Sequence, residues 1–122
     1  MTLESNKALA RRWFEEVITG RNPAAIDEIY HPNYTHRGPD GHELNIHDAK
    51  RVAAGLLKAS PDRVARVIAQ IAEGDTVVTR WESRGTLPGE SGRAMVVCGI
   101  VISRIADGHI IEDWEVTSIV EA

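Results

Sequence analysis

Charged residues stand two apart in two stretches of the C-terminal half that otherwise read as β-strands. Arg80 and Glu82 share the first stretch with Val78, and Glu112 shares the second with Trp114. Alternate side chains of a strand point to the same face, about 6.6 Å apart along the backbone. A carboxylate beside a guanidinium could therefore act as a general acid or base while the arginine stabilises negative charge. The alternative is an ion pair on a solvated sheet face.

The even-numbered positions of these stretches form one set on each strand. Residues 78 to 84 and 110 to 118 mix charged and hydroxyl groups with aliphatic and aromatic side chains. Because unpaired charge is costly to bury in a dry core, we expect both sets to line one enclosed pocket. Glu112 is then either a catalytic carboxylate or a rim carboxylate paired to Arg104 or Arg93. In the last strand the expected pocket wall comprises Glu112, Trp114, Val116 and Ser118.

Four of the five histidines lie within a stretch of 17 residues, which raises the question of a metal site. Their spacings of five, six and five residues fit neither a pair one helical turn apart nor a familiar zinc motif, so we expect no metal. His36 differs from the other histidines because it lies two residues after Tyr34 in a short strand-like segment, where its side chain should point into the fold. It is the best candidate for a general base, the alternative being a histidine hydrogen-bonded in the core. The four histidines are His31, His36, His42 and His47.

Hydrophobic spacing and capping residues predict three helices in the first half of the chain. Leu9, Trp13 and Val17 recur at helical spacing, and Gly20 can end their helix. A second helix begins at Asn22-Pro23, and a third follows Asn45. The expected bounds are 5–19 with a cap at Ser5 or Asn6, about 22–30 stopped by Pro32, and 45–60 ended before Pro61.

From Arg63 onward the hydrophobic period changes to two, which predicts β-strands. Tight turns are expected at 73–75 and 106–108, and a further glycine-containing turn at 88–92. A short strand at 33–37 precedes the third helix. Three helices followed by four long antiparallel strands indicate an α+β fold with the helices on one face of the sheet.

Short motifs occur in a consistent order along nearly the whole chain. They are Gly20-Arg21-Asn22, Tyr34-Thr35-His36, Ala72 to Val78, Arg80-Trp81, Gly85-Thr86, Gly99-Ile100, Arg104 to Ile110, and Glu112 with Trp114. Together they resemble the NTF2-like superfamily and, within it, the SnoaL-like polyketide cyclases, which are related to limonene epoxide hydrolase and ketosteroid isomerase. The resemblance implies a cone-shaped barrel in which three N-terminal helices pack on a curved, mainly antiparallel sheet around a hydrophobic pocket.

The resemblance places two known acid–base sites on this chain, and neither is complete. The cyclases usually carry an aspartate four residues after the tryptophan of the last strand, where this chain has Ser118. Limonene epoxide hydrolases carry an Arg-x-Asp pair that corresponds to Arg80 and Glu82, and a second aspartate at the position of Val116. The chain therefore keeps part of one constellation and lacks the defining acid of the other.

The function that the resemblance favours is acid–base catalysis, a cyclisation or isomerisation through an enolate, on a small hydrophobic oxygenated substrate. One alternative is epoxide-hydrolase-like water activation, in which Tyr34 and His36 replace a water-orienting tyrosine and asparagine. Another is a non-catalytic small-molecule binding protein, because both family aspartates are replaced. The expected catalytic residues are His36, Arg80, Glu82 and Glu112, and the expected substrate-binding residues are Trp13, Tyr34, Trp114, Val116 and Ser118.

Composition restricts the remaining classes of function. The 122 residues suit one domain spanning 1–122, and a net charge of −4 without a basic stripe argues against nucleic-acid binding. No apolar run approaches the roughly 20 residues of a membrane span, and the charged N-terminus lacks a secretory signal, so we expect a cytoplasmic protein without a membrane partner. The absence of a glycine-rich phosphate loop predicts that no cofactor binds. Trp81, opposite in parity to Arg80, is a candidate for a homodimer interface.

Overall fold

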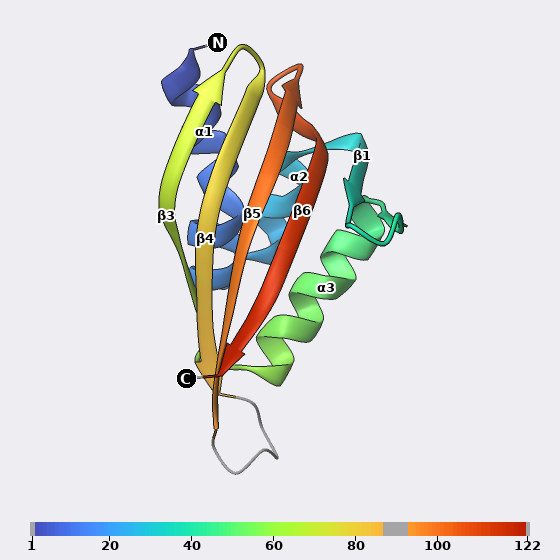
Figure 1. The fold of residues 1–122 in the computed structure, drawn as a ribbon. Coiled ribbons are helices and arrows are strands. Elements are labelled where there is room, and N and C mark those ends of the chain that lie inside the picture. Colours follow the sequence, from blue (N-terminus) through green and yellow to red (C-terminus); the bar gives the residue numbers. More distant parts are fainter. Residues whose placement is uncertain (1, 87–92, 122) are drawn as a thin grey trace.

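The computed structural model of the chain describes residues 2–86 and 93–121. Helical segments come first and long strands follow (Figure 1). The glycine-containing turn expected at 88–92 lies outside the described residues. The elements are α1 (Leu3–Arg12), η1 (Trp13–Thr19), η2 (Pro23–Ala25), α2 (Ile26–Ile29), β1 (Tyr30–Arg37), β2 (Glu43–Leu44), α3 (Ile46–Ala59), β3 (Val64–Glu73), β4 (Thr76–Thr86), β5 (Ala94–Ala106) and β6 (His109–Glu121).

Six strands form one curved, unclosed sheet in the order β2-β1-β6-β5-β4-β3. Strands β3 to β6 pair antiparallel in chain order, whereas β1 pairs with β6 in parallel, so the sheet is mixed. Figure 1 shows α1 and α2 behind the long strands and α3 alongside β6. The predicted α+β fold, with helices first and four long antiparallel strands after them, is confirmed.

Capping boxes begin helices α1 and α3. Thr2 Oγ1 accepts the Ser5 N–H at 3.0 Å, and Ser5 Oγ accepts the Thr2 N–H at 3.0 Å. The prediction that Ser5 or Asn6 caps the first helix was wrong, because Ser5 is the reciprocal partner inside the first turn. Asn45 caps α3 as predicted, with its side chain accepting the Asp48 N–H at 3.0 Å.

The first helix continues beyond α1 as the wider, π-helical segment η1. Gly20 ends it as predicted, and the Gly20 N–H donates to the Glu15 carbonyl at 3.0 Å. π-Helical turns are uncommon in proteins and frequently occur at functional sites. This one carries two neighbouring aromatic residues, Trp13 and Phe14, whose rings reach the interior described below.

Strand β1 begins at Tyr30, three residues before the predicted strand 33–37, and it contains Pro32. Its pairing with β6 shifts register between Tyr30 and Thr35. Proline has no N–H to donate to a ladder, and an irregular stretch of a strand is one of the few places that accept it. Pro32 signals only the end of the preceding helix, so the prediction began the strand too late.

Burial along β4 shows which side of the long strands faces the helices. Val77, Thr79 and Trp81 are buried, whereas Arg80 is exposed. The odd-numbered side chains of β4 therefore point toward the helices, and the even-numbered ones point to the outer face of the sheet. The prediction that even-numbered positions 78–84 line a pocket was wrong. Arginine reaches solvent on the outer face, and the Thr79 hydroxyl is hydrogen-bonded inside the core by the Gln70 amide at 3.2 Å.

The core lies between the helices and this inner face of the sheet. Its buried apolar residues come from the helical segments and from strands β1, β3, β4, β5 and β6, so it joins both halves of the chain. Across residues 2–86 and 93–121, no helix has the length and apolar character needed to cross a membrane. Fully buried apolar side chains include Val17, Ile26, Ile29, Val77 and Ile110.

Candidate active site

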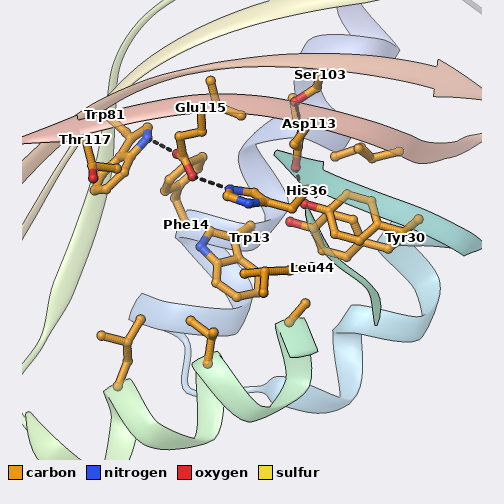
Figure 2. Close-up of a pocket in the computed structure, with 17 residues that line it drawn as sticks. Trp13, Phe14, Tyr30, His36, Leu44, Trp81, Ser103, Asp113, Glu115 and Thr117 are labelled. Carbon is orange, nitrogen blue, oxygen red and sulfur yellow. Dashed lines mark hydrogen bonds and ion pairs between the residues drawn. The ribbon is translucent and has the colours of Figure 1, made fainter. Parts of the chain in front are cut away.

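A cavity of about 230 Å³ lies between the helices and the inner face of the sheet. Its walls are mainly apolar, and polar groups enter them from β1, β5 and β6 (Figure 2). An apolar cavity with a few convergent polar groups is typical of a small-molecule site. The apolar walls include Trp13, Phe14, Tyr30, Leu56, Val101 and Ile110.

Glu115 on β6 occupies the wall between two nitrogen donors from other strands. Its Oε1 lies 2.8 Å from His36 Nε2, and its Oε2 accepts the Trp81 indole N–H at 2.7 Å. Both contacts are visible in Figure 2. The hydrogen bond to Glu115 raises the pKa of His36, against the opposing effect of burial. The pair therefore favours an imidazolium next to a carboxylate on the cavity wall.

Asp113, two residues earlier on β6, is surrounded by hydroxyl groups instead. Its Oδ2 accepts the Tyr34 hydroxyl at 2.6 Å, and its Oδ1 accepts the Ser103 hydroxyl at 2.5 Å. Burial raises the pKa of Asp113 from 3.8 to about 6, although both hydroxyl donors lower it. Burial also raises the pKa of Tyr34 well above its ordinary value, so this hydroxyl keeps its proton.

The two acids occupy different environments on one cavity wall. Residues two apart on a strand lie about 7 Å apart, so both carboxyl groups can reach the same small ligand. Asp113 is almost completely buried and its pKa lies near neutrality, whereas Glu115 is partly open to the cavity. Two carboxyl groups with different burial and different hydrogen-bond partners can take different roles in acid–base chemistry.

The comparison with known families identifies the fold around this cavity. The profile of the SnoaL-like domain matches residues 10–113, which is most of the chain. The chain belongs to the SnoaL-like family. The resemblance read from the sequence motifs is thereby confirmed, and the NTF2-like architecture with it. No protein with a curated description matches the sequence.

Solved structures of other SnoaL-like proteins superpose on almost the full chain. AclR from Streptomyces galilaeus, a candidate hydroxylase, is 25% identical with a TM-score of 0.85, over 96% of this chain and 81% of its own. A candidate polyketide cyclase from Acidithiobacillus ferrooxidans is 25% identical with a TM-score of 0.80, over 97% of this chain and 92% of its own. IdmH from Streptomyces antibioticus, 22% identical with a TM-score of 0.83 over 93% of this chain and 91% of its own, shares the fold.

The SnoaL-like pocket contains only part of the predicted site. Trp13, Tyr34 and His36 line it, where the sequence analysis placed them. Tyr34 and His36 also contact the two cavity-facing carboxylates of β6, those of Asp113 and Glu115. The other predicted residues do not line the pocket, and they are Arg80, Glu82, Glu112, Trp114, Val116 and Ser118.

These six residues lie on the outer face of the sheet, away from the cavity. Glu112 pairs with Arg37, and Arg104 Nε lies 3.8 Å from its second oxygen, as in the rim alternative. Glu82 pairs with Arg84. Their placement in a pocket was wrong, because arginine partners and solvent satisfy these charges on an open face.

The error on β6 has a local cause, a bulge at residue 111. Ile105 pairs with Ile110, but Arg104 pairs with Glu112, so one extra residue interrupts the alternation. Ile110 faces the cavity as expected, and the bulge then turns Asp113 inward and Glu112 outward. The prediction that even-numbered side chains of this strand face the pocket is correct at Ile110. Beyond the bulge at residue 111, the odd-numbered side chains face it instead.

Several pocket residues escaped the sequence analysis, and four of them form the hydrogen bonds described above. Trp81, expected at a dimer interface, is only 9% exposed and lines the cavity, so that prediction was wrong. The other three are Ser103, Asp113 and Glu115. A signal for two of them was present, because Asp113, Glu115 and Thr117 place two acids and a hydroxyl on one parity of a single strand.

The histidines do not assemble into a ligand set. Among the residues that the structure describes, no group of three or more His, Cys, Asp or Glu side chains could hold a metal ion. His36 is bound to Glu115, and His42 is bound to Asp40.

Proposed function

We propose that this SnoaL-like protein is an enzyme that transfers protons on a small, mainly apolar molecule bearing a carbonyl group. The observation that carries the proposal is the Glu115 carboxylate, held on the wall of an apolar cavity between His36 and Trp81. The expected reaction is an isomerisation or a ring closure through an enolate.

The cost of this arrangement favours catalysis over simple binding. Removing an ion pair from water costs several kcal/mol per ion, and an apolar pair of similar size would stabilise the fold at least as well. In addition, His36 Nδ1 is buried without a hydrogen-bond partner among the described residues. Perturbed titratable groups and unsatisfied polar atoms in a cleft are typical of active sites.

The charges of the site suit enolate chemistry. Glu115 would accept a proton from the carbon next to the carbonyl group, and the electron pair of that C–H bond would form the enolate. Glu115 is then neutral, and the imidazolium of His36 remains to stabilise the negative enolate oxygen. Glu115 would return the proton to a different carbon in an isomerisation. In a ring closure, the enolate carbon would attack a second carbonyl group of the same molecule, the electron pair of that C=O bond would move to its oxygen, and this oxygen would take the proton held by Glu115.

The cavity volume restricts the substrate. The volume of about 230 Å³ lies below the roughly 300–1,000 Å³ of common ligand pockets, which favours a small substrate. Larger substrates would have to extend through the side of the cavity where Val52 and Thr117 are both exposed.

Proton exchange with heavy water tests the function without knowledge of the product. Small cyclic ketones would be incubated with the protein in D₂O, and deuterium at the carbon next to the carbonyl group would be followed by NMR. Glu115→Gln should abolish the exchange that the wild type catalyses. Glu112→Gln is the matched control, because Glu112 lies on the same strand but faces outward. Equal exchange in wild type and Glu115→Gln would overturn the proposal.

We propose further that two copies of the chain associate through the outer face of the sheet. Apolar side chains at the centre of this face are exposed, with Trp114 at 45% and Ile100 at 46%. Arg80 and Glu82 lie beside them, so a twofold arrangement could bring opposite charges of two copies together. A homodimer would cover this apolar surface and leave the cavity on the opposite side of the sheet accessible.

A further inference from the structure

The Trp81 side chain spans an unusual distance within the sheet. Trp81 belongs to β4, but its indole N–H donates to Glu115 on β6, and β5 lies between these strands. Neighbouring strands are about 4.8 Å apart, so the indole has to lie across the whole width of β5. Figure 2 shows its nitrogen directed at the Glu115 carboxylate.

Gly99 is the residue of β5 that the indole crosses. It pairs directly with Trp81 in the β4–β5 ladder and is buried. A Cβ atom at Gly99 would lie 2.4 Å from Cε2 and Cζ2 of the Trp81 indole, and 2.6 Å from its Nε1. Real Cβ atoms do not approach other atoms so closely. The contacted atoms belong to a rigid ring system, so the whole indole would have to move.

We propose that Gly99 is a positioning residue that acts through Trp81. The missing side chain at Gly99 provides the space in which the indole lies across β5 and reaches Glu115 Oε2. An indole N–H can only donate, so Trp81 fixes one carboxylate oxygen as an acceptor while His36 contacts the other. Gly99 thereby sets the orientation of the proposed catalytic base without touching the substrate.

The effect of Gly99 on turnover rests on the proposed function, whereas its effect on the indole does not. In Gly99→Ala the indole is displaced and its hydrogen bond to Glu115 is lost. Loss of a hydrogen bond to a charged group corresponds to a fall in kcat of about tenfold to a hundredfold. KM should change less, because the cavity walls that hold the ligand are otherwise retained.

The experiment compares Gly99→Ala, Trp81→Phe and the double variant, with Gly55→Ala as the matched control. A Cβ at Gly55 meets no atom within 4 Å, so its alanine variant should leave the indole and kcat unchanged, while the higher helix propensity of alanine in α3 should raise its unfolding midpoint. The Trp81 indole N–H resonance, assigned by its absence in Trp81→Phe, is recorded without substrate. It should shift in Gly99→Ala and stay in place in Gly55→Ala. Unfolding midpoints, kcat and KM are measured for all four variants.

The double variant separates positioning from a general structural role. Phenylalanine lacks the Cζ2 atom and the N–H of the indole, so its smaller ring can turn away from an alanine at Gly99 without losing a hydrogen bond. We expect Gly99→Ala to lower the unfolding midpoint more in the wild type than in Trp81→Phe, and kcat of the double variant to equal that of Trp81→Phe. Additive losses, or an unshifted indole resonance in Gly99→Ala, would overturn the inference. A shifted resonance with unchanged turnover would support the positioning and contradict the proposed role of Glu115.

Discussion

Asparagine at position 113 would remove a buried titratable carboxyl group while keeping its shape and its hydrogen bonds. The amide oxygen can accept the Tyr34 hydroxyl, as Asp113 does now. The amide N–H can donate to Ser103 once that hydroxyl turns from donor to acceptor. The variant therefore changes charge and little else, which makes it a direct probe of the free energy that the ionised carboxylate costs.

The magnitude follows from the pKa of Asp113, which burial raises from 3.8 to about 6. Below pH 3.8 the group is protonated in both the folded and the unfolded chain. As the pH rises from 4 to 6, the unfolded chain releases its proton first, so this group makes the folded state progressively less stable. Above pH 6 the loss is complete, and at about 1.4 kcal/mol per unit it amounts to about 3 kcal/mol.

Urea unfolding of wild type and Asp113→Asn, at intervals from pH 4 to pH 7.5, measures this effect. The unfolding free energy of the variant, measured relative to that of the wild type, should increase by about 3 kcal/mol as the pH rises from 4 through 6. The stabilising contribution of His36 is also lost as the pH rises above 6.5, because its pKa is raised. Glu115, the main cause of that raised pKa, is present in both proteins, so most of this contribution cancels.

Asp62→Asn provides a control of opposite sign. Hydrogen bonds from Thr86 lower the pKa of Asp62, so this carboxylate contributes stability above pH 3.8 that is lost as the pH falls. Its asparagine variant should therefore be less stable than wild type at neutral pH. A difference between Asp113→Asn and wild type that stays constant from pH 4 to pH 7.5 would refute the assigned burial of an ionisable Asp113.

The remaining predictions concern the cavity and the outer face. Glu115→Gln should lower deuterium exchange by about 10² or more, as loss of a general base does, while Glu112→Gln stays within about twofold of wild type. The imidazole of His36, followed by NMR, should titrate above 6.5 in the wild type and closer to 6.5 in Glu115→Gln, because the hydrogen bond that His36 donates to Glu115 is the main cause of its raised pKa. Trp114→Arg should halve the molecular mass in sedimentation equilibrium, and a wild type that already sediments as a monomer would contradict the proposed homodimer.

The order and type of the elements could be predicted because they depend on local signals. Asn45, Gly20 and the glycine-containing turns at Gly74 and Gly108 work through residues within five positions of themselves. Strand β1 was placed less well, since its start at Tyr30 depends on pairing with β6, which lies far along the chain. Signals that require a distant partner cannot be read from a local pattern.

The candidate site was predicted less well, because its contacts also join distant parts of the chain. In addition, the alternation of side chains along β6 was counted wrongly. Tyr34 and His36 were found because they lie on a short strand with a recognisable motif. Asp113 and Glu115 were missed because alternation was counted through the bulge at residue 111, which the sequence does not mark with glycine or proline. A single inserted residue moves every later side chain of a strand to the other face.

The three acids within residues 112–115 differ in what binds them, and the proposed function depends on this difference. Glu112 faces two arginines, Arg37 and Arg104, on the outer face of the sheet. Asp113 and Glu115 face hydroxyls, an indole and an imidazole, which are neutral or can change their own charge, so a proton can arrive or leave. Those partners lie far away in the sequence, since His36 is 79 residues from Glu115 and Trp81 is 34 residues from it. The identity of a carboxylate's partner is therefore decided by the fold, and in this chain the inner face of β6 is where the fold supplies partners suited to proton transfer.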